Sequence, residues 1–193
     1  VVLVGCGKKP VEEPVFDQGR PDVTKPSKPP AKTEAQIEAE NKTFTETKAK
    51  AEAGDAEAQF NLGFMYRKGQ EVEQDFKEAV KWYQKAADQG FAKAQCNLGV
   101  MYERGKGVEQ DFKEAVKWHQ KAADQGLATA QNNLGFIYAN GKGVEQNFVT
   151  GYAWWNIAAT NGQQNAKKGL PQVAKAMTPA QITEAGELVK EMV

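Results

Sequence analysis

Apolar residues between about residues 54 and 161 follow two alternating helical patterns. In the narrower one, Ala94, Leu98, Met101 and Tyr102 keep the spacing i, i+4, i+7, i+8, which places them on one face of a helix. We name this segment helix A. In the wider one, helix B, apolar positions cover a broad arc, and polar residues fill the remainder. In its first occurrence that arc comprises Phe76, Ala79, Val80, Trp82, Tyr83, Ala86 and Ala87. Helix A and helix B alternate along the chain, which predicts a series of helix pairs.

The two patterns belong to an internal repeat of thirty-six residues. Successive copies begin at Gly54, Gly90, Gly126 and Gly162, and the first two copies differ at only nine positions. A helix pair of this length cannot bury its apolar surface alone, so neighbouring pairs must stack. The predicted fold is all-α, an α-solenoid of tandem antiparallel helix pairs. The three repeats span residues 54–89, 90–125 and 126–161.

Glycines and capping residues mark the ends of the predicted helices. A glycine follows each helix A and suits the left-handed conformation that ends a helix. Asp75 and Asp111 precede helix B and are expected to cap it. Glu71 replaces the glycine that the other two copies have at 107 and 143, which predicts a different turn in the first repeat. A second glycine lies inside each helix A, where it favours close approach of helix B. These internal glycines are Gly63, Gly99 and Gly135.

Segments outside the repeats are expected to cap the array. Residues 34–53 form a predicted N-terminal helix, with Ile37 and Phe44 as its larger apolar contacts. Residues 162–193 contain two predicted C-terminal helices. Pro171 is expected to interrupt the first, and Thr178 should start the second through a capping box.

The repeat resembles a known family. The residues that carry the resemblance are Ala94, Leu98, Gly99, Tyr102, Gly105, Gly107, Val108, Asp111, Ala115, Trp118, Ala122, Ala123 and Gly126. This pattern is similar to the Sel1-like repeat, which is related to tetratricopeptide repeats. The resemblance implies a protein-interaction scaffold in which helix A lines a concave surface, although hydrolase activity on cell-wall or β-lactam substrates has been proposed for some relatives. The chain departs from the pattern at Gly151, where the other copies have alanine.

The first thirty-three residues are expected to form an anchor and a tether. Residues 1–6 end in Leu3-Val4-Gly5-Cys6, which resembles a bacterial lipobox at the end of a signal peptide. The prediction is a lipid anchor on Cys6, and because Gly7 rather than aspartate follows, an outer-membrane location facing the periplasm. The alternative is an ordinary apolar N-terminus with a free thiol. Residues 7–33 hold six of the eight prolines and are predicted to form a disordered linker.

Composition and charge argue against several other functions. Twenty-five basic residues balance twenty-five acidic ones, so nucleic acid is not an expected partner. The sequence has one serine, Ser27, and one histidine, His119, and His119 falls within the apolar arc of helix B. A packed and hydrogen-bonded histidine is the expected reading. We therefore predict no catalytic residue, no cofactor and no metal site, and no enzymatic activity.

A row of variable positions along helix A is the predicted partner-binding surface. Five of the nine differences between the first two repeats lie on one arc of helix A, away from its apolar face. From these positions and their equivalents we select eight residues as the helix-A row: Phe60, Phe64, Arg67, Cys96, Val100, Glu103, Asn132 and Phe136. The row either binds a protein or peptide partner or packs against the adjacent helix A. The predicted function is an envelope scaffold or adaptor; the alternatives are a self-assembling structural lipoprotein or, less favoured, a hydrolase.

Overall fold

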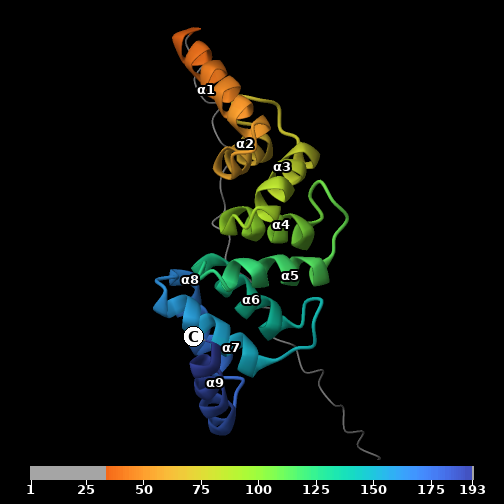
Figure 1. Cartoon of the computed structure of the whole chain (residues 1–193). Coiled ribbons are helices and arrows are strands. Elements are labelled where there is room, and N and C mark those ends of the chain that lie inside the picture. Colours follow the sequence, from red (N-terminus) through yellow and green to blue (C-terminus); the bar gives the residue numbers. More distant parts are fainter. Residues whose placement is uncertain (1–33, 193) are drawn as a thin grey trace, which may run out of the picture. The chain divides into compact units, whose positions relative to one another are not determined.

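The computed structural model describes residues 34–192, and side chains from residue 42 onward. The predictions for the lipobox, the linker and Ile37 lie outside these residues. All regular elements in the described part are α-helices (Figure 1). In chain order they are α1 (Glu34–Glu52), α2 (Ala56–Lys68), α3 (Phe76–Asp88), α4 (Ala92–Arg104), α5 (Phe112–Ala123), α6 (Ala128–Asn140), α7 (Phe148–Thr160), α8 (Gln164–Ala174) and α9 (Pro179–Met192).

The helices form the predicted tandem pairs. Helices α2, α4 and α6 are the three copies of helix A, and α3, α5 and α7 are the three copies of helix B. Each helix packs mainly on its neighbours in sequence, while α1 covers α2 and both α8 and α9 pack on α7 (Figure 1). The prediction of an α-solenoid with helical caps is confirmed for the described residues.

The core repeats with the sequence. The leucine of each helix A (Leu62, Leu98 or Leu134) is completely buried, and the first tryptophan of each helix B (Trp82, Trp118 or Trp154) is at most 9% exposed. Each buried leucine contributes about 1.5–3 kcal/mol relative to an exposed one. The same leucine and tryptophan positions are buried in all three repeats, so each repeat stabilises the stack through the same apolar contacts.

The glycine inside each helix A lets a ring of helix B lie against its backbone. A Cβ atom on Gly99 would lie 2.7 Å from the His119 ring, and one on Gly63 would lie 2.8 Å from the Tyr83 ring. The ring of Trp155 occupies the same place over Gly135. The predicted close approach of helix B is therefore correct.

The turn between α2 and α3 corrects one prediction. Glu71 has φ of +63°, close to the +75° of Gly107 and the +70° of Gly143, so the first turn is not different. A Cβ atom on Gly107 would overlap the backbone of Phe76, and one on Gly143 would overlap Phe112. Those contacts come from helix B of the preceding repeat. The first repeat has no preceding helix B, so glutamate fits there without that overlap.

The C-terminal segment corrects a second prediction. Pro171 does not end α8, which continues to Ala174. Pro171 and Lys167, whose carbonyl loses its helical donor, are both exposed, so water can replace the lost hydrogen bond. The capping box at the start of α9 is confirmed, because Thr178 and Gln181 each accept a hydrogen bond from the other's backbone N–H.

A series of buried glutamines joins the repeats. Gln95 Nε2 donates to the Ala87 carbonyl at the end of α3 (3.1 Å), and its Oε1 accepts from Gln125 Nε2 (2.7 Å). Gln59 and Gln131 make equivalent bonds in their own repeats. Each glutamine is therefore a second donor to a carbonyl at the end of the preceding helix, which also accepts from the backbone N–H of the turn glycine. The helical pattern of apolar residues did not indicate these glutamines.

Candidate partner-binding surface

The structure divides the helix-A row into buried and partly exposed members. Cys96 is 4% exposed and belongs to the core, so the prediction that it contacts a partner at the surface is wrong. Burial raises the pKa of its thiol to about 12, which makes it unreactive at neutral pH. The remaining members are partly exposed: Phe60, Phe64, Arg67, Val100, Glu103, Asn132 and Phe136.

Phe60 belongs mainly to the packing between repeats. Its ring lies 5.9 Å from that of Tyr83 and 5.3 Å from that of Phe91, measured between centroids. Tyr83 belongs to α3, and Phe91 lies in the turn between α3 and α4. Phe60 therefore has a packing role, but its ring contacts are with helix B and with the residue that caps the next helix A, not with the adjacent helix A alone as expected.

Phe64, Val100 and Phe136 are the apolar members that remain available. They occupy equivalent positions on α2, α4 and α6, so they mark a line that crosses the three repeats. Two of them carry cations on their rings. Arg67 Cζ lies 4.9 Å from the centroid of Phe64, and Lys142 Nζ lies 4.7 Å from that of Phe136. Aromatic rings bordered by cations are suited to a partner with both apolar and acidic groups.

The polar members of the row connect to helix B. Arg67 Nε donates to the Tyr83 hydroxyl at 3.1 Å, and Trp155 Nε1 donates to the Asn132 carbonyl at 3.1 Å. These bonds fix the orientation of the second ring of helix B against helix A. Two members of the row are therefore joined by hydrogen bonds to the helix B of their own repeat.

His119 departs from the predicted hydrogen-bonded state. It is fully buried, as expected, but neither ring nitrogen has a hydrogen-bond partner among the described residues. Burial lowers the pKa of His119 to about 4, although the Glu103 carboxylate lies 4.0 Å from Nε2. The ring is neutral at physiological pH and is packed against Gly99, which supports a packing role.

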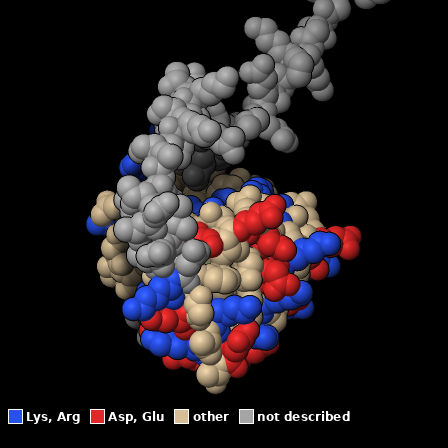
Figure 2. Space-filling view, turned by 90° about the horizontal axis from the view of Figure 1, so that it is seen from above, with Lys and Arg blue, Asp and Glu red and all other residues tan. Residues whose placement is uncertain are grey.

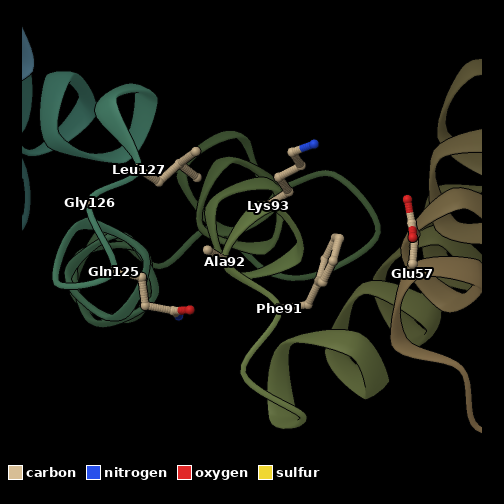
Figure 3. Close-up of a pocket in the computed structure, with 7 residues that line it drawn as sticks. All are labelled: Glu57, Phe91, Ala92, Lys93, Gln125, Gly126 and Leu127. Atoms are coloured by element: carbon tan, nitrogen blue, oxygen red, sulfur yellow. The ribbon is translucent and has the colours of Figure 1, made fainter. Parts of the chain in front are cut away.

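A shallow hollow opens near the N-terminal ends of the A helices. It has a volume of about 400 Å³ and lies where α2, α4 and the turn before α6 meet. In Figure 3 the Phe91 ring stands between the helix that carries Lys93 and the helix that carries Glu57. Lys93 and Glu57 occupy the same position in successive repeats, so the charge changes sign from one repeat to the next.

A second hollow, of about 180 Å³, lies at the opposite ends of these helices, where α2 and α4 terminate. Both charges are interspersed over the surface seen in Figure 2, but the residues that line this hollow include only basic ones among the charged types. Its lining comprises Arg67, Lys68, Gln74, Phe76, Val100, Met101, Arg104 and Lys106. Of these residues, only Arg67 and Val100 belong to the predicted helix-A row. Basic residues near the ends of two successive helices A were the available signal.

The described residues contain no group of three or more His, Cys, Asp or Glu side chains that could hold a metal ion. Within residues 34–192, no helix is both long and apolar enough to span a bilayer.

Comparisons with known proteins agree with the repeat. The Sel1 repeat model matches residues 56–91, 92–127 and 128–163, which together exceed half of the chain. These boundaries lie two residues after those drawn from the glycines, with the same period. No curated protein sequence gives a significant match.

The solved structures that resemble this one include two repeat proteins. The protective antigen c5321 of uropathogenic Escherichia coli, which has an SLR fold, is 38% identical with a TM-score of 0.73; the match covers 77% of this chain and 32% of that one. A Sel1 repeat protein from Oxalobacter formigenes is 36% identical with a TM-score of 0.64, covering 70% of this chain and 54% of that one. The chain thus spans only about a third to a half of the length of these relatives. On the strength of its three matched repeats and of the helix pairs that they build, the chain belongs to the Sel1 repeat family.

Proposed function

We propose that this chain is a protein-interaction scaffold of the bacterial cell envelope, which binds a protein or peptide partner along the helix-A row. The observation that carries the proposal is the line of partly exposed apolar residues, Phe64, Val100 and Phe136, on three successive helices A. Apolar side chains that cross several repeats without forming part of the core are typical of an interaction surface. Membership of the Sel1 repeat family supports binding as the general role.

We also propose that the protein acts by binding a partner and not by catalysing a reaction. The only histidine, His119, is fully buried, and the only serine, Ser27, lies outside the described residues. A lipid anchor on Cys6 and an outer-membrane location facing the periplasm are part of the same proposal, and they rest on the lipobox resemblance alone. Labelling with a fatty-acid probe in a bacterial host tests the anchor: the parent precursor should incorporate the probe and Cys6→Ser should not.

Site-directed photo-crosslinking tests the partner-binding surface. A photo-reactive amino acid at position 100 should crosslink a defined partner in envelope extracts, whereas the same group at position 117, on the exposed side of α5, should not. Phe64→Ala combined with Phe136→Ala should reduce the crosslink while helicity stays at the parent value. Equal crosslinking from both positions, or no effect of the double variant, would rule out the helix-A row as the binding surface.

A further inference from the structure

The hollow between the C-terminal ends of α2 and α4 collects four cations. Arg67 and Lys68 come from the last turn of α2, Arg104 ends α4, and Lys106 follows it in the turn. No acidic residue lines the hollow. In a chain whose charges balance overall, this is a local concentration of positive charge.

These cations are not neutralised by carboxylates. None of the four forms an ion pair with another residue of the described part of the chain. Three of them lie over aromatic rings instead. Lys106 Nζ is 4.7 Å from the Phe76 centroid, and Arg67 Cζ and Lys68 Nζ are 4.9 Å and 5.8 Å from that of Phe64. Arg67 uses Nε for the Tyr83 hydroxyl, so its terminal guanidinium nitrogens still have donors available for an anion.

The C-terminal ends of helices attract cations in general, and this effect alone could place basic residues here. The next repeat argues against that explanation. Helix α6 has no basic residue in its last turn, although it ends in the same way at Gly141. At the corresponding junction between α4 and α6, the positions of Arg67, Lys68, Arg104 and Lys106 hold Glu103, Arg104, Asn140 and Lys142. The formal charge falls from four positive to one positive, while the framework is retained.

The retained framework is visible in the turn. Gln74 Nε2 donates to the Arg67 carbonyl at 2.8 Å, and Gln110 Nε2 donates to the Glu103 carbonyl at 2.7 Å. The same helix ends and the same turn therefore form both junctions. The charges differ between them, and Phe136 and Ile137 stand in place of Val100 and Met101. The fold therefore does not require four cations at the first junction.

We propose that this hollow binds an acidic segment of a protein partner, with carboxylates on Arg67 and Arg104 and an apolar side chain against Phe76 and Val100. Guanidinium groups bind carboxylates through paired hydrogen bonds, which supplies the specificity for acid. The volume, about 180 Å³, is below the 300–1,000 Å³ typical of small-molecule sites and suits individual side chains. This inference rests on the proposed function, since Arg67 and Val100 belong to the helix-A row, and it specifies the chemistry of the partner.

The test uses the full chain and a fluorescein-labelled peptide of sequence Glu-Leu-Glu-Glu-Leu-Glu, followed by fluorescence anisotropy. The test variant combines R67E and R104N, which installs the residues that the next junction has naturally. The matched control combines K167E and K168N on the exposed side of α8, and it changes the net charge by the same amount. Circular dichroism confirms that both variants fold.

The parent should bind the acidic peptide, weaken as sodium chloride rises, and not bind the peptide with lysine in place of glutamate. R67E/R104N should bind at least about tenfold more weakly than the parent, and K167E/K168N within about twofold. Absence of binding to the parent, or equal weakening in the two variants, would overturn this inference. A crosslink from position 100 that persists in R67E/R104N would also overturn it while leaving the proposed function standing. If the parent binds the acidic peptide but gives no crosslink from position 100, the result would instead contradict the proposed function.

Discussion

At the scale of single residues, the second ring position of helix B distinguishes the three repeats. Tyr83, His119 and Trp155 all lie over a glycine of helix A, but their polar atoms differ in how they are satisfied. Tyr83 and Trp155 have hydrogen-bond partners, whereas His119 has none among the described residues. The central repeat therefore contains a buried titratable group without a partner, and this makes its stability depend on pH.

The structure predicts that acid destabilises the protein through His119. Its pKa is about 4 when folded and about 6.5 when unfolded, so the unfolded state binds the extra proton between these values. The stability from this residue is complete above pH 6.5 and is lost as the pH falls toward 4, by up to about 3 kcal/mol. Chemical denaturation at pH 7.5 and pH 4.5 measures the effect.

His119→Tyr, which copies the first repeat, is the matched control. Its loss of stability over the same pH range should be smaller by most of that amount, because tyrosine stays neutral throughout. Parallel pH profiles for parent and variant would show that His119 does not account for any acid sensitivity.

Gly107 provides a second prediction at the residue scale. Gly107→Ala should lower the free energy of unfolding by at least about 2 kcal/mol, since alanine must adopt a positive φ and its Cβ would overlap the backbone of Phe76. Glu71→Gly makes the reverse change at the equivalent position of the first repeat, where Glu71 already has a positive φ. It should leave stability unchanged or raise it, because glycine adopts a positive φ without strain. Urea unfolding compares the two, and a Gly107→Ala protein as stable as the parent would contradict the turn geometry.

At the scale of helices, the joint between one pair and the next depends on hydrogen bonds as well as on apolar packing. Gln95 reaches back to the end of α3 and is held in turn by Gln125 at the end of α5. One side chain thus connects three consecutive helices. A buried amide with both partners in place favours one relative position of those helices, because any other position leaves polar atoms unpaired.

Gln95→Leu should therefore cost about 1–3 kcal/mol, although leucine is the more apolar residue. The buried Ala87 carbonyl at the joint keeps the Gly90 N–H as its donor but loses Gln95, and Gln125 loses its acceptor. Together these losses outweigh the gain in apolar contact. Gln125→Ala removes only the exposed partner and should cost less than about 1 kcal/mol. Thermal unfolding of the two variants measures the difference; a Gln95→Leu protein with raised stability would show that the joint does not need the amide.

At the scale of the whole array, each helix contacts mainly its neighbours along the chain. Stability in such an array is close to a sum of repeat and junction contributions. A defect in the central repeat therefore weakens the connection between the two ends, whereas a defect at an end does not.

Leu98→Ala tests this organisation, because Leu98 is completely buried in the middle repeat. The cavity should cost about 2–5 kcal/mol. Hydrogen exchange should then show α2 and α3 opening separately from α6 and α7, whereas in the parent protein we expect these four helices to open together. A single cooperative transition with unchanged exchange in the variant would indicate that the array behaves as one unit.

How far the sequence predicts this molecule depends on how local each feature is. The repeat, the helix pairs and the packing at Gly99 follow from periodicity along one chain segment. The burial of Cys96 does not, because a helical wheel shows which side a residue faces but not which helix covers that side. The role of Gln95 is not predicted either, because its hydrogen-bond partner, the Ala87 carbonyl, belongs to the preceding helix pair. The basic hollow needs residues from α2, α3, α4 and two turns together, so no single segment predicts it.

The shared joint also bears on how the length of such proteins can change. A duplicated copy of residues 90–125, inserted after Gln125, would present the same glutamine to the same alanine carbonyl at both of its new boundaries. The turn glycine of the copy would likewise meet a phenylalanine that begins the helix B before it. Gain or loss of a whole thirty-six-residue unit thus requires no compensating substitution, while insertion of any other length would place Gln95 and Gly107 out of register with their partners.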